Sequence, residues 1–158
     1  ISGGEPTLQN LSIIRNALPQ SYSIEVESNG TQIPHKKFPS FTFQDYFCFQ
    51  WNISPKMANA GEVLDEESFL HWAKLSSYHN RIYFKFVIRK QEASLDLKEM
   101  EEIVSRFSLP KEKVSLMAEG VDVASQKEAA WLAKYCQERG FRYTPRLHVL
   151  LYGHKRLV

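Results

Sequence analysis

The sequence predicts an α/β fold, a parallel sheet with crossover helices in the form of a partial (β/α) barrel. Helical and strand-like segments alternate regularly along the 158 residues, which favours parallel strands joined by helices. The expected strands end at glycine and polar residues, and the reactive face of such folds lies at these strand ends. No linker, repeat or low-complexity tract interrupts the chain, so we expect a single domain over residues 1–158.

The first half of the chain predicts one helix and two strands. Apolar residues recur at helical spacing between two prolines: Leu8, Leu11, Ile14 and Leu18, with Pro6 before them and Pro19 after them. Residues 22–27 alternate like a strand and end at the turn signal of residues 28–31. Residues 31–44 contain prolines and no clear period, so we expect a loop there. The aromatic-rich segment 46–53 predicts the second strand.

The middle of the chain predicts a helix, a strand and a further helix. Asp65 is the expected N-cap of the first helix, because the two glutamates after it favour the positive end of a helix dipole. The buried stripe of this helix comprises Phe69, Leu70, Trp72, Ala73 and Leu75. Residues 81–89 predict a strand. Ser94 or Asp96 can start the next helix, whose inward residues are Leu97, Met100, Ile103, Val104 and Phe107.

The last third predicts two strands around one long helix. Residues 114–118 form a strand that ends at Glu119 and Gly120. The helix runs from Ser125 to Arg139, its inner face carries Ala129, Leu132, Ala133 and Cys136, and Gly140 ends it. Residues 142–151 predict the final strand, in which Pro145 marks an edge or a bulge.

The start of the chain is typical of a strand that enters a turn. Ile1 and Ser2 stand directly before Gly3-Gly4, and the first residue is not methionine. Because a strand needs about five residues to pair well, we infer that residues upstream have been lost, by processing, by design of the expressed chain or by disorder.

The composition excludes several classes of protein. Hydrophobic residues make up 43% and charged residues 24%, an ordinary globular mixture. A net charge of +2 is too small for a nucleic-acid-binding stripe or a membrane patch. No apolar run approaches the roughly 20 residues of a membrane span, and the first ten residues do not resemble a signal peptide. We therefore expect neither a nucleic-acid nor a membrane partner.

The cysteine content favours a cytoplasmic location. Cys48 and Cys136 lie far apart, each in an apolar or amphipathic stretch, so we expect no disulfide framework. Two separate cysteines cannot build a four-thiolate site or a three-cysteine cluster loop. We therefore expect no metal site made by this chain.

The polar and glycine residues at the strand ends can line one mouth that binds a polar small ligand. Each also has a plain structural interpretation. Gly3-Gly4 can be an ordinary turn between strand and helix, Asn29-Gly30 is a common turn former, and Glu27 can be a solvated strand end. Ser54-Pro55 can simply end a strand. These residues alone leave the two interpretations open.

The histidines and the aromatic segment also have two interpretations. His148 on the apolar last strand is either a core histidine or a site residue, whereas His71 and His79 flank a helix end and are expected at the surface. Residues 41–51 can be a stacking platform for bases or a buried strand, and the lack of surrounding basic residues favours the strand. The sequence has no HxxxH metal motif, GxSxG nucleophile elbow or P-loop, and we assign no catalytic residue.

Five segments, taken in order, resemble the 7-carboxy-7-deazaguanine synthase family of the radical S-adenosylmethionine (SAM) superfamily: ISGGEP, VESNGT, NISPKMANAGE, VSLMAEGVD and RYTPRLHVLLYGHKR. GGEP marks the superfamily, and the SPK and PRLH segments are narrower. The resemblance covers essentially the whole chain but not the family's first part, which would precede Ile1. It implies a barrel of the radical SAM type that is incomplete at its N-terminus.

The resemblance also implies which residues contact the ligands. Gly4 matches a glycine whose backbone receives the methionine part of SAM, and Glu27 resembles the carboxylate at a ribose-contacting strand end. The other implied SAM contacts are Ser54, Pro55 and Lys56, and the turn Met117, Ala118, Glu119 and Gly120. Near the substrate, Ser2 matches a hydroxyl residue and His148 a histidine. In relatives a terminal carboxylate can also reach the substrate, but the tail ending at Val158 differs from those endings.

The implied reaction is a ring contraction with loss of ammonia. In this family a reduced 4Fe–4S iron–sulfur cluster cleaves SAM to a 5′-deoxyadenosyl radical, which takes hydrogen from 6-carboxy-5,6,7,8-tetrahydropterin. The product is 7-carboxy-7-deazaguanine, Mg²⁺ assists, and the pathway is queuosine and 7-deazaguanine biosynthesis. The implied partners are the pterin substrate, an electron donor protein and a second copy of the chain in a homodimer.

The chain departs from the family in one respect. The cluster cysteines of the family lie upstream of GGEP, and Cys48 and Cys136 lie in the wrong elements to replace them. We therefore predict that the 158-residue chain alone has no radical activity. Two alternatives stay open: a cluster-free relative that binds SAM or a pterin without turnover, and a generic α/β domain with accidental motif matches.

Overall fold

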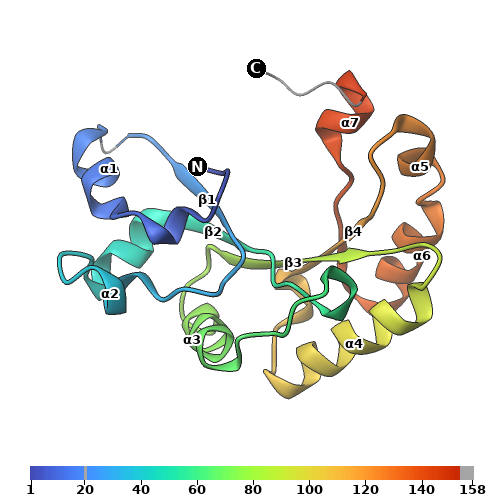
Figure 1. The fold of residues 1–158 in the computed structure, drawn as a ribbon, viewed down its shortest axis with the longest axis horizontal. Helices are drawn as coiled ribbons and strands as arrows, with labels where there is room; N and C mark the ends of the chain where they lie inside the picture. The colour runs from blue at the N-terminus through green and yellow to red at the C-terminus, as the bar shows by residue number, and fades with distance from the viewer. Residues whose placement is uncertain (20, 154–158) are drawn as a thin grey trace. The chain divides into compact units, whose positions relative to one another are not determined.

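The computed structural model describes residues 1–19 and 21–153, which form two compact units, Ile1–Phe84 and Lys85–Val158. The described strands form one sheet in sequence order: β1 (Ile24–Ser28), β2 (Phe49–Ile53), β3 (Ile82–Ile88), β4 (Val114–Ala118) and β5 (Arg142–Tyr143). The pairs β1–β2, β2–β3 and β4–β5 are parallel, with helices between the strands (Figure 1). The predicted α/β class with a parallel sheet and crossover helices is therefore confirmed.

The first unit contains three α-helices and three short 3₁₀ turns among its described residues: η1 (Pro6–Leu8), α1 (Leu11–Ala17), α2 (Pro34–Lys37), η2 (Phe43–Cys48), η3 (Ala58–Ala60) and α3 (Glu66–Ser76). Asn10 caps α1, since its Oδ1 accepts a hydrogen bond from the Ser12 amide at 3.2 Å. Asp65 caps α3 as predicted, because its Oδ1 accepts the Ser68 amide at 2.9 Å.

The core of the first unit is aromatic. Trp51 and Trp72 lie with their ring centroids 4.8 Å apart, and both are completely buried. The indole Nε1 of Trp51 donates to the Tyr46 carbonyl at 3.0 Å, so its polar edge is satisfied inside the core. Phe41 packs edge-on against Tyr46 at 5.0 Å. Area buried by such rings dominates the stability of a small core.

The predicted strand at residues 46–53 begins late. Its first part is η2 instead, because the Asp45 carboxylate accepts hydrogen bonds from both the Thr42 amide, at 2.6 Å, and the Thr42 hydroxyl, at 2.8 Å. This capping box starts a helical turn that a strand cannot accommodate. The expectation of a buried strand is confirmed for β2 and wrong for η2, where Phe43 and Phe47 are 49% and 41% exposed. The expected loop over residues 31–44 contains α2, which begins at Pro34.

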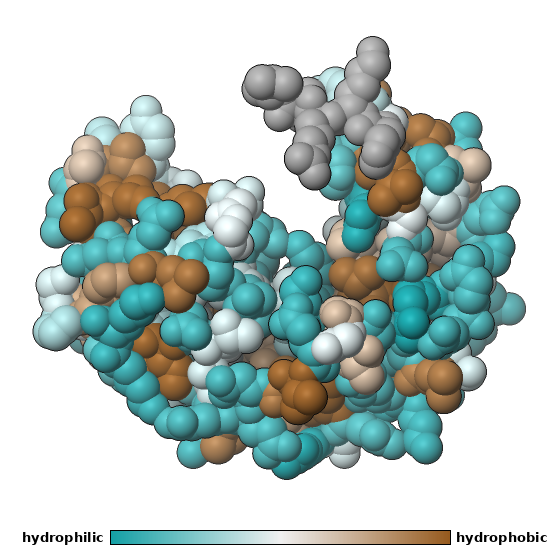
Figure 2. Space-filling view, in the orientation of Figure 1, coloured by the Kyte–Doolittle hydropathy of each residue, from teal (hydrophilic) through white to brown (hydrophobic). Residues whose placement is uncertain are grey.

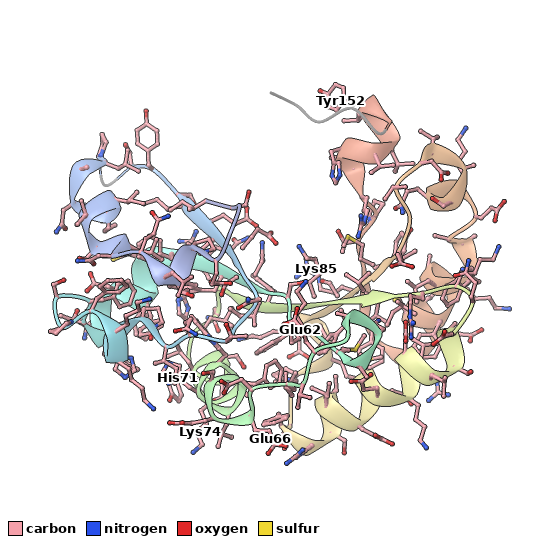
Figure 3. All side chains as sticks on the ribbon, viewed as in Figure 1. Glu62, Glu66, His71, Lys74, Lys85 and Tyr152 are labelled. Atoms are coloured by element: carbon pink, nitrogen blue, oxygen red, sulfur yellow. The ribbon has the colours of Figure 1, made fainter. Side chains whose placement is uncertain are left out.

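Of the two histidines expected at the surface, His79 is buried and His71 is half-buried. His79 is 3% exposed; its Nε2 donates to the Tyr46 carbonyl at 2.8 Å, and its Nδ1 accepts from the Arg81 amide at 3.1 Å. His71 lies on α3 (Figure 3). Its ring is 5.2 Å from that of His35 on α2. Burial and the neighbouring positive charges of α2 lower the pKa of His71 to about 4. The spacing along α3 could not reveal a partner that lies on another element.

The second unit contains four α-helices and one 3₁₀ turn among its described residues: α4 (Ala93–Arg106), η4 (Lys111–Lys113), α5 (Val123–Lys127), α6 (Ala130–Arg139) and α7 (Leu147–Tyr152). The predicted helix over residues 125–139 is wrong in one detail, because it is divided between α5 and α6. Asp122 starts α5 early by accepting the Ser125 amide at 2.8 Å. The helix is then interrupted at Glu128 and Ala129, because their ψ angles of 0° and 9° depart from the helical value of about −42°. Gly140 ends α6 at φ 78°, as predicted.

The predicted last strand is mostly wrong. Only Arg142 and Tyr143 pair with β4 among the described residues, and the Thr144 amide makes the final ladder bond to Leu116 at 3.0 Å. Pro145 has no amide hydrogen and cannot continue the ladder. The Arg146 amide instead donates to the Gln126 side chain at 3.0 Å, and α7 begins at Leu147. The chain therefore turns away from the sheet, and α5 and α7 contact each other (Figure 1).

The predicted start of α4 is also displaced. The helix begins at Ala93, so neither Ser94 nor Asp96 is its N-cap, and the capping position belongs to Glu92. Asp96 lies in the first turn and is 1% exposed, because its carboxylate binds Arg89 at the end of β3. An ion pair between the helix and the end of β3 has replaced the local cap that the sequence suggested.

The face of the molecule in Figure 2 is mixed, with hydrophilic residues between separate apolar patches, one of them over α1. Leu8 and Ile13 contribute to the exposed apolar surface there, being 48% and 65% exposed. Such scattered residues are normal for globular proteins. Among the described helices, none combines the length and the apolar character that crossing a membrane requires.

Ser108 offers a test of the local backbone at the end of α4. It is the non-glycine residue with positive φ, 52°, in the part of the chain that the structure describes. The Leu109 amide donates to the Val104 carbonyl at 2.9 Å across it, a helix ending that favours glycine at this position. We expect Ser108→Gly to raise the free energy of unfolding by about 0.5–1 kcal/mol, because the Cβ atom is strained in the left-handed region.

Urea unfolding of the two variants Ser108→Gly and Ser108→Ala measures this effect. Alanine retains the Cβ atom and is the matched control, so it should give no gain. Equal stabilities of the two variants would contradict the strain interpretation.

Candidate functional site

The candidate site lies on a sheet whose two faces differ in chemistry. Residues alternate between buried and half-buried along β2, β3 and β4. The buried face is apolar and comprises, among others, Phe49, Trp51, Ile53, Phe84, Phe86, Val114 and Leu116. The other face carries mostly polar side chains, such as Gln50, Asn52, Tyr83 and Ser115. Parallel sheets are normally buried on both faces by apolar residues, so a polar face is unusual and is a candidate ligand surface.

In the first unit, the glycine turn is fixed at the carboxyl end of β1. Ile1 pairs beside β1, accepting the Glu27 amide at 3.0 Å. Gly3 and Gly4 follow with φ of 92° and 58°, and a Cβ atom at either would meet nothing within 4 Å. Their conformation therefore requires glycine, while the space beside them stays open to a ligand.

Glu5 anchors this turn to the sheet. Its Oε1 accepts from the Ser28 hydroxyl at 2.7 Å and from the Thr7 amide at 3.1 Å, and its Oε2 accepts from the Asn29 amide at 2.8 Å. One half-buried carboxylate thus joins η1, β1 and the turn after β1. In the sequence Glu5 stands out only as part of the GGEP segment, because its role follows from contacts with residues far along the chain.

The ends of β1 and β2 lie side by side. The Ser54 amide donates to the Ser28 carbonyl at 2.7 Å, Pro55 is buried, and Lys56 is exposed. Lys56 lines a small recess together with Asn29, Gly30, Thr31, Glu62, Val63, Leu64, Asp65 and Phe69. The structure therefore brings Gly4, Glu27 and the segment Ser54–Lys56 to the same end of neighbouring strands. Ser2 lies exposed just before the glycine turn.

Four polar side chains on β1 and β2 lie beside these strand ends: Glu25, Glu27, Gln50 and Asn52. We call them the polar array. The register places Glu25 opposite Gln50 and Glu27 opposite Asn52. The Asn52 amide nitrogen donates to Glu27 Oε1 at 2.8 Å and also to Glu25 Oε1. Of the array, only Glu27 was a sequence-predicted site residue. The alternation of polar and apolar residues along both strands could have revealed the others.

In the second unit, the turn after β4 opens onto a cavity of about 650 Å³. Three sequence-predicted residues line it, Ala118, Glu119 and Gly120, and Ser125, Glu128 and Trp131 are among the others. The Glu119 amide donates to the Ile88 carbonyl at 2.9 Å, which fixes the turn to the end of β3. Gly120 has a φ of 147°, and a Cβ atom there would lie 2.3 Å from the Ser125 hydroxyl. Glycine is therefore required by close packing as well as by backbone conformation.

Two other predicted residues of the second unit do not line this cavity. Met117 is half-buried on β4, on the opposite face from Ala118. His148 is exposed on α7, so both the predicted strand position and the core-histidine interpretation are wrong. Whether His148 contacts a substrate stays a prediction. Val158 lies outside the described residues.

The described residues do not fit an iron–sulfur cluster. No group of three or more His, Cys, Asp or Glu side chains among residues 1–19 and 21–153 could hold a metal. Cys48 lies in η2, and Cys136 is buried in α6. Burial raises the pKa of Cys136 to about 11, which disfavours the thiolate that metal binding needs.

Comparison with known proteins supports the resemblance found in the sequence. No protein-family model matches the chain. A protein of Pyrobaculum aerophilum is 29% identical over 162 residues, and a protein of Rhodopirellula baltica is 24% identical over 172 residues. Both matches cover 99% of the chain, and both proteins are named 7-carboxy-7-deazaguanine synthase. The chain spans 65% and 62% of their lengths. The predicted resemblance to this family is thereby confirmed.

Proposed function

We propose that this chain is part of a 7-carboxy-7-deazaguanine synthase, a radical SAM lyase that contracts 6-carboxy-5,6,7,8-tetrahydropterin to 7-carboxy-7-deazaguanine with loss of ammonia. The observation that carries the proposal is the match of 99% of the chain to two proteins of that name. The arrangement of glycine turns at the carboxyl ends of β1 and β4 supports it, because ligands of parallel α/β folds bind at such ends.

The residues of this chain suit SAM. In the first unit we propose Gly4, Glu27 and the segment Ser54–Lys56 as its contacts. An open glycine turn lets backbone groups approach the amino-acid part, and a carboxylate at a strand end can accept hydrogen bonds from ribose hydroxyls. In the second unit we propose the turn Met117–Gly120. Its cavity of about 650 Å³ falls in the usual range for small-molecule sites, roughly 300–1,000 Å³.

The residues of this chain bind and orient, while the cofactors supply the difficult chemistry. SAM, when bound, is the source of the radical that takes hydrogen from the substrate. Ser2 and His148 are proposed to lie near the pterin. Because the described residues do not fit the cluster, their own part is confined to holding SAM and the substrate. The full proposal adds a 4Fe–4S cluster, Mg²⁺, an electron donor protein and a homodimer.

The full-length protein that carries this chain tests the proposal. It should be purified without oxygen, its cluster reconstituted, and then supplied with SAM, Mg²⁺, a chemical reductant and the tetrahydropterin. We expect mass spectrometry to detect 7-carboxy-7-deazaguanine and 5′-deoxyadenosine, both dependent on SAM. A protein that binds SAM and a cluster yet returns the pterin unchanged would overturn the proposal.

A further inference from the structure

Asn52 stands between two carboxylates on the polar face of the first unit. Its side-chain amide nitrogen donates to Glu27 Oε1 at 2.8 Å and to Glu25 Oε1. Across β2 the register places Tyr83 on its other side. Gln50, two residues earlier on the same face, donates to Glu25 at 3.0 Å. Asn52 is therefore the shared donor of the polar array.

The arrangement has an electrostatic consequence. Glu25 and Glu27 are neighbours on one face of β1, because residues two apart in a strand point the same way. Two like charges at this spacing repel each other. A donor between them offsets the repulsion and fixes both carboxylates by hydrogen bonds, which are stronger when the acceptor is charged. Without it, the Glu27 carboxylate loses one of the hydrogen bonds that fix its direction.

We propose that Asn52 is a positioning residue that holds the Glu27 carboxylate in place for the ribose hydroxyls of a nucleoside ligand. The inference rests on the proposed function, in which Glu27 contacts SAM. Glu25 is the like-charged neighbour with which Glu27 shares this donor. A hydrogen bond to a polyhydroxyl ligand depends on the direction of the carboxylate, so a carboxylate that is free to turn binds more weakly.

The array is not needed for the core. Glu25 is exposed, and Glu27 and Asn52 are only half-buried. The opposite side of β2 carries the completely buried residues Phe49, Trp51 and Ile53. Loss of the Asn52 amide should therefore change ligand binding and leave the melting temperature nearly unchanged.

Binding of S-adenosylhomocysteine to the full-length protein, measured by calorimetry, tests this inference. We expect Asn52→Leu, which keeps the size and removes the donor, to weaken binding about tenfold. Asn52→Asp adds a third carboxylate and should weaken it further. Gln50→Leu is the comparison variant from the same strand and face: it removes a donor to Glu25 and none to Glu27, so it should weaken binding less than Asn52→Leu does.

A double variant separates positioning from general damage. Replacing Glu25 by glutamine in the Asn52→Leu protein removes the repelling charge, so most of the lost affinity should return. If Asn52 has only a structural role, the effects of the two substitutions on binding affinity should instead add. Wild-type affinity in Asn52→Leu, or an additive double variant, would overturn the inference while leaving the proposed function intact. Failure of the wild-type protein to bind the nucleoside would overturn both.

Discussion

Replacement of Asp96 by alanine should lower the free energy of unfolding by about 2–3 kcal/mol, because three donors lose a buried charged acceptor while the partly exposed Arg89 guanidinium keeps Glu92 as a partner. Asp96 is 1% exposed, and its carboxylate holds three groups of Arg89. Oδ2 accepts from the backbone amide at 2.8 Å and from Nε at 3.2 Å, and Oδ1 accepts from Nη2 at 2.8 Å. Alanine would remove the acceptor of all three donors where α4 meets the end of β3.

Glu92 provides the matched control, because it binds the same guanidinium from the same helix end. Its Oε2 lies 2.6 Å from Arg89 Nη2, but its side chain is 50% exposed. Exposed pairs contribute little, so Glu92→Ala should cost less than about 1 kcal/mol. Urea unfolding of both variants measures the difference. Equal costs would show that burial of the Asp96 carboxylate is not what stabilises this junction.

The same ion pair shows where sequence reasoning about the fold stops. Strands β3 and β4 and the Asp65 cap of α3 were predicted because their signals are local: alternation, helical spacing and a capping residue. The position of Asp96 depends on Arg89, a contact that no local pattern encodes. His79 was misassigned for a similar reason, since its partner is the Tyr46 carbonyl. Strands were wrongly predicted at residues 46–48 and 144–151, because a short run of apolar residues looks alike in a strand and in a helix.

The candidate site was predictable to the extent that it consists of strand ends. Glycine turns after β1 and β4 were identified because few residues other than glycine adopt their conformations. The polar array was not identified, although Glu25 and Glu27 on β1 alternate with buried residues, as do Gln50 and Asn52 on β2. Which of the two faces stays polar depends on where the helices pack. That arrangement follows from tertiary structure rather than from any one strand.

Replacement of Gly30 by alanine is the second change expected to have a large effect, about 2–4 kcal/mol of lost stability. Gly30 has a φ of 77°, and a Cβ atom there would lie 2.7 Å from Ile53 Cγ2 and 3.6 Å from Trp72 Cδ1. The conformational strain contributes about 1 kcal/mol, and forcing an extra carbon against a packed core contributes about 1–3 kcal/mol. Ile53 and Trp72 are completely buried and cannot move aside cheaply.

Gly61 separates these two contributions. Its φ is 71°, close to that of Gly30, but a Cβ atom there would meet nothing within 4 Å. Gly61→Ala should therefore lose only the conformational part, about 1 kcal/mol, and the difference between the two variants in urea unfolding measures the contact with Ile53. In an Ile53→Leu background, which lacks the Cγ2 atom, Gly30→Ala should cost less than it does in the wild-type protein. If Gly30→Ala and Gly61→Ala cost the same, the turn after β1 is set by its backbone alone, and the core beneath it has room that the structure does not show.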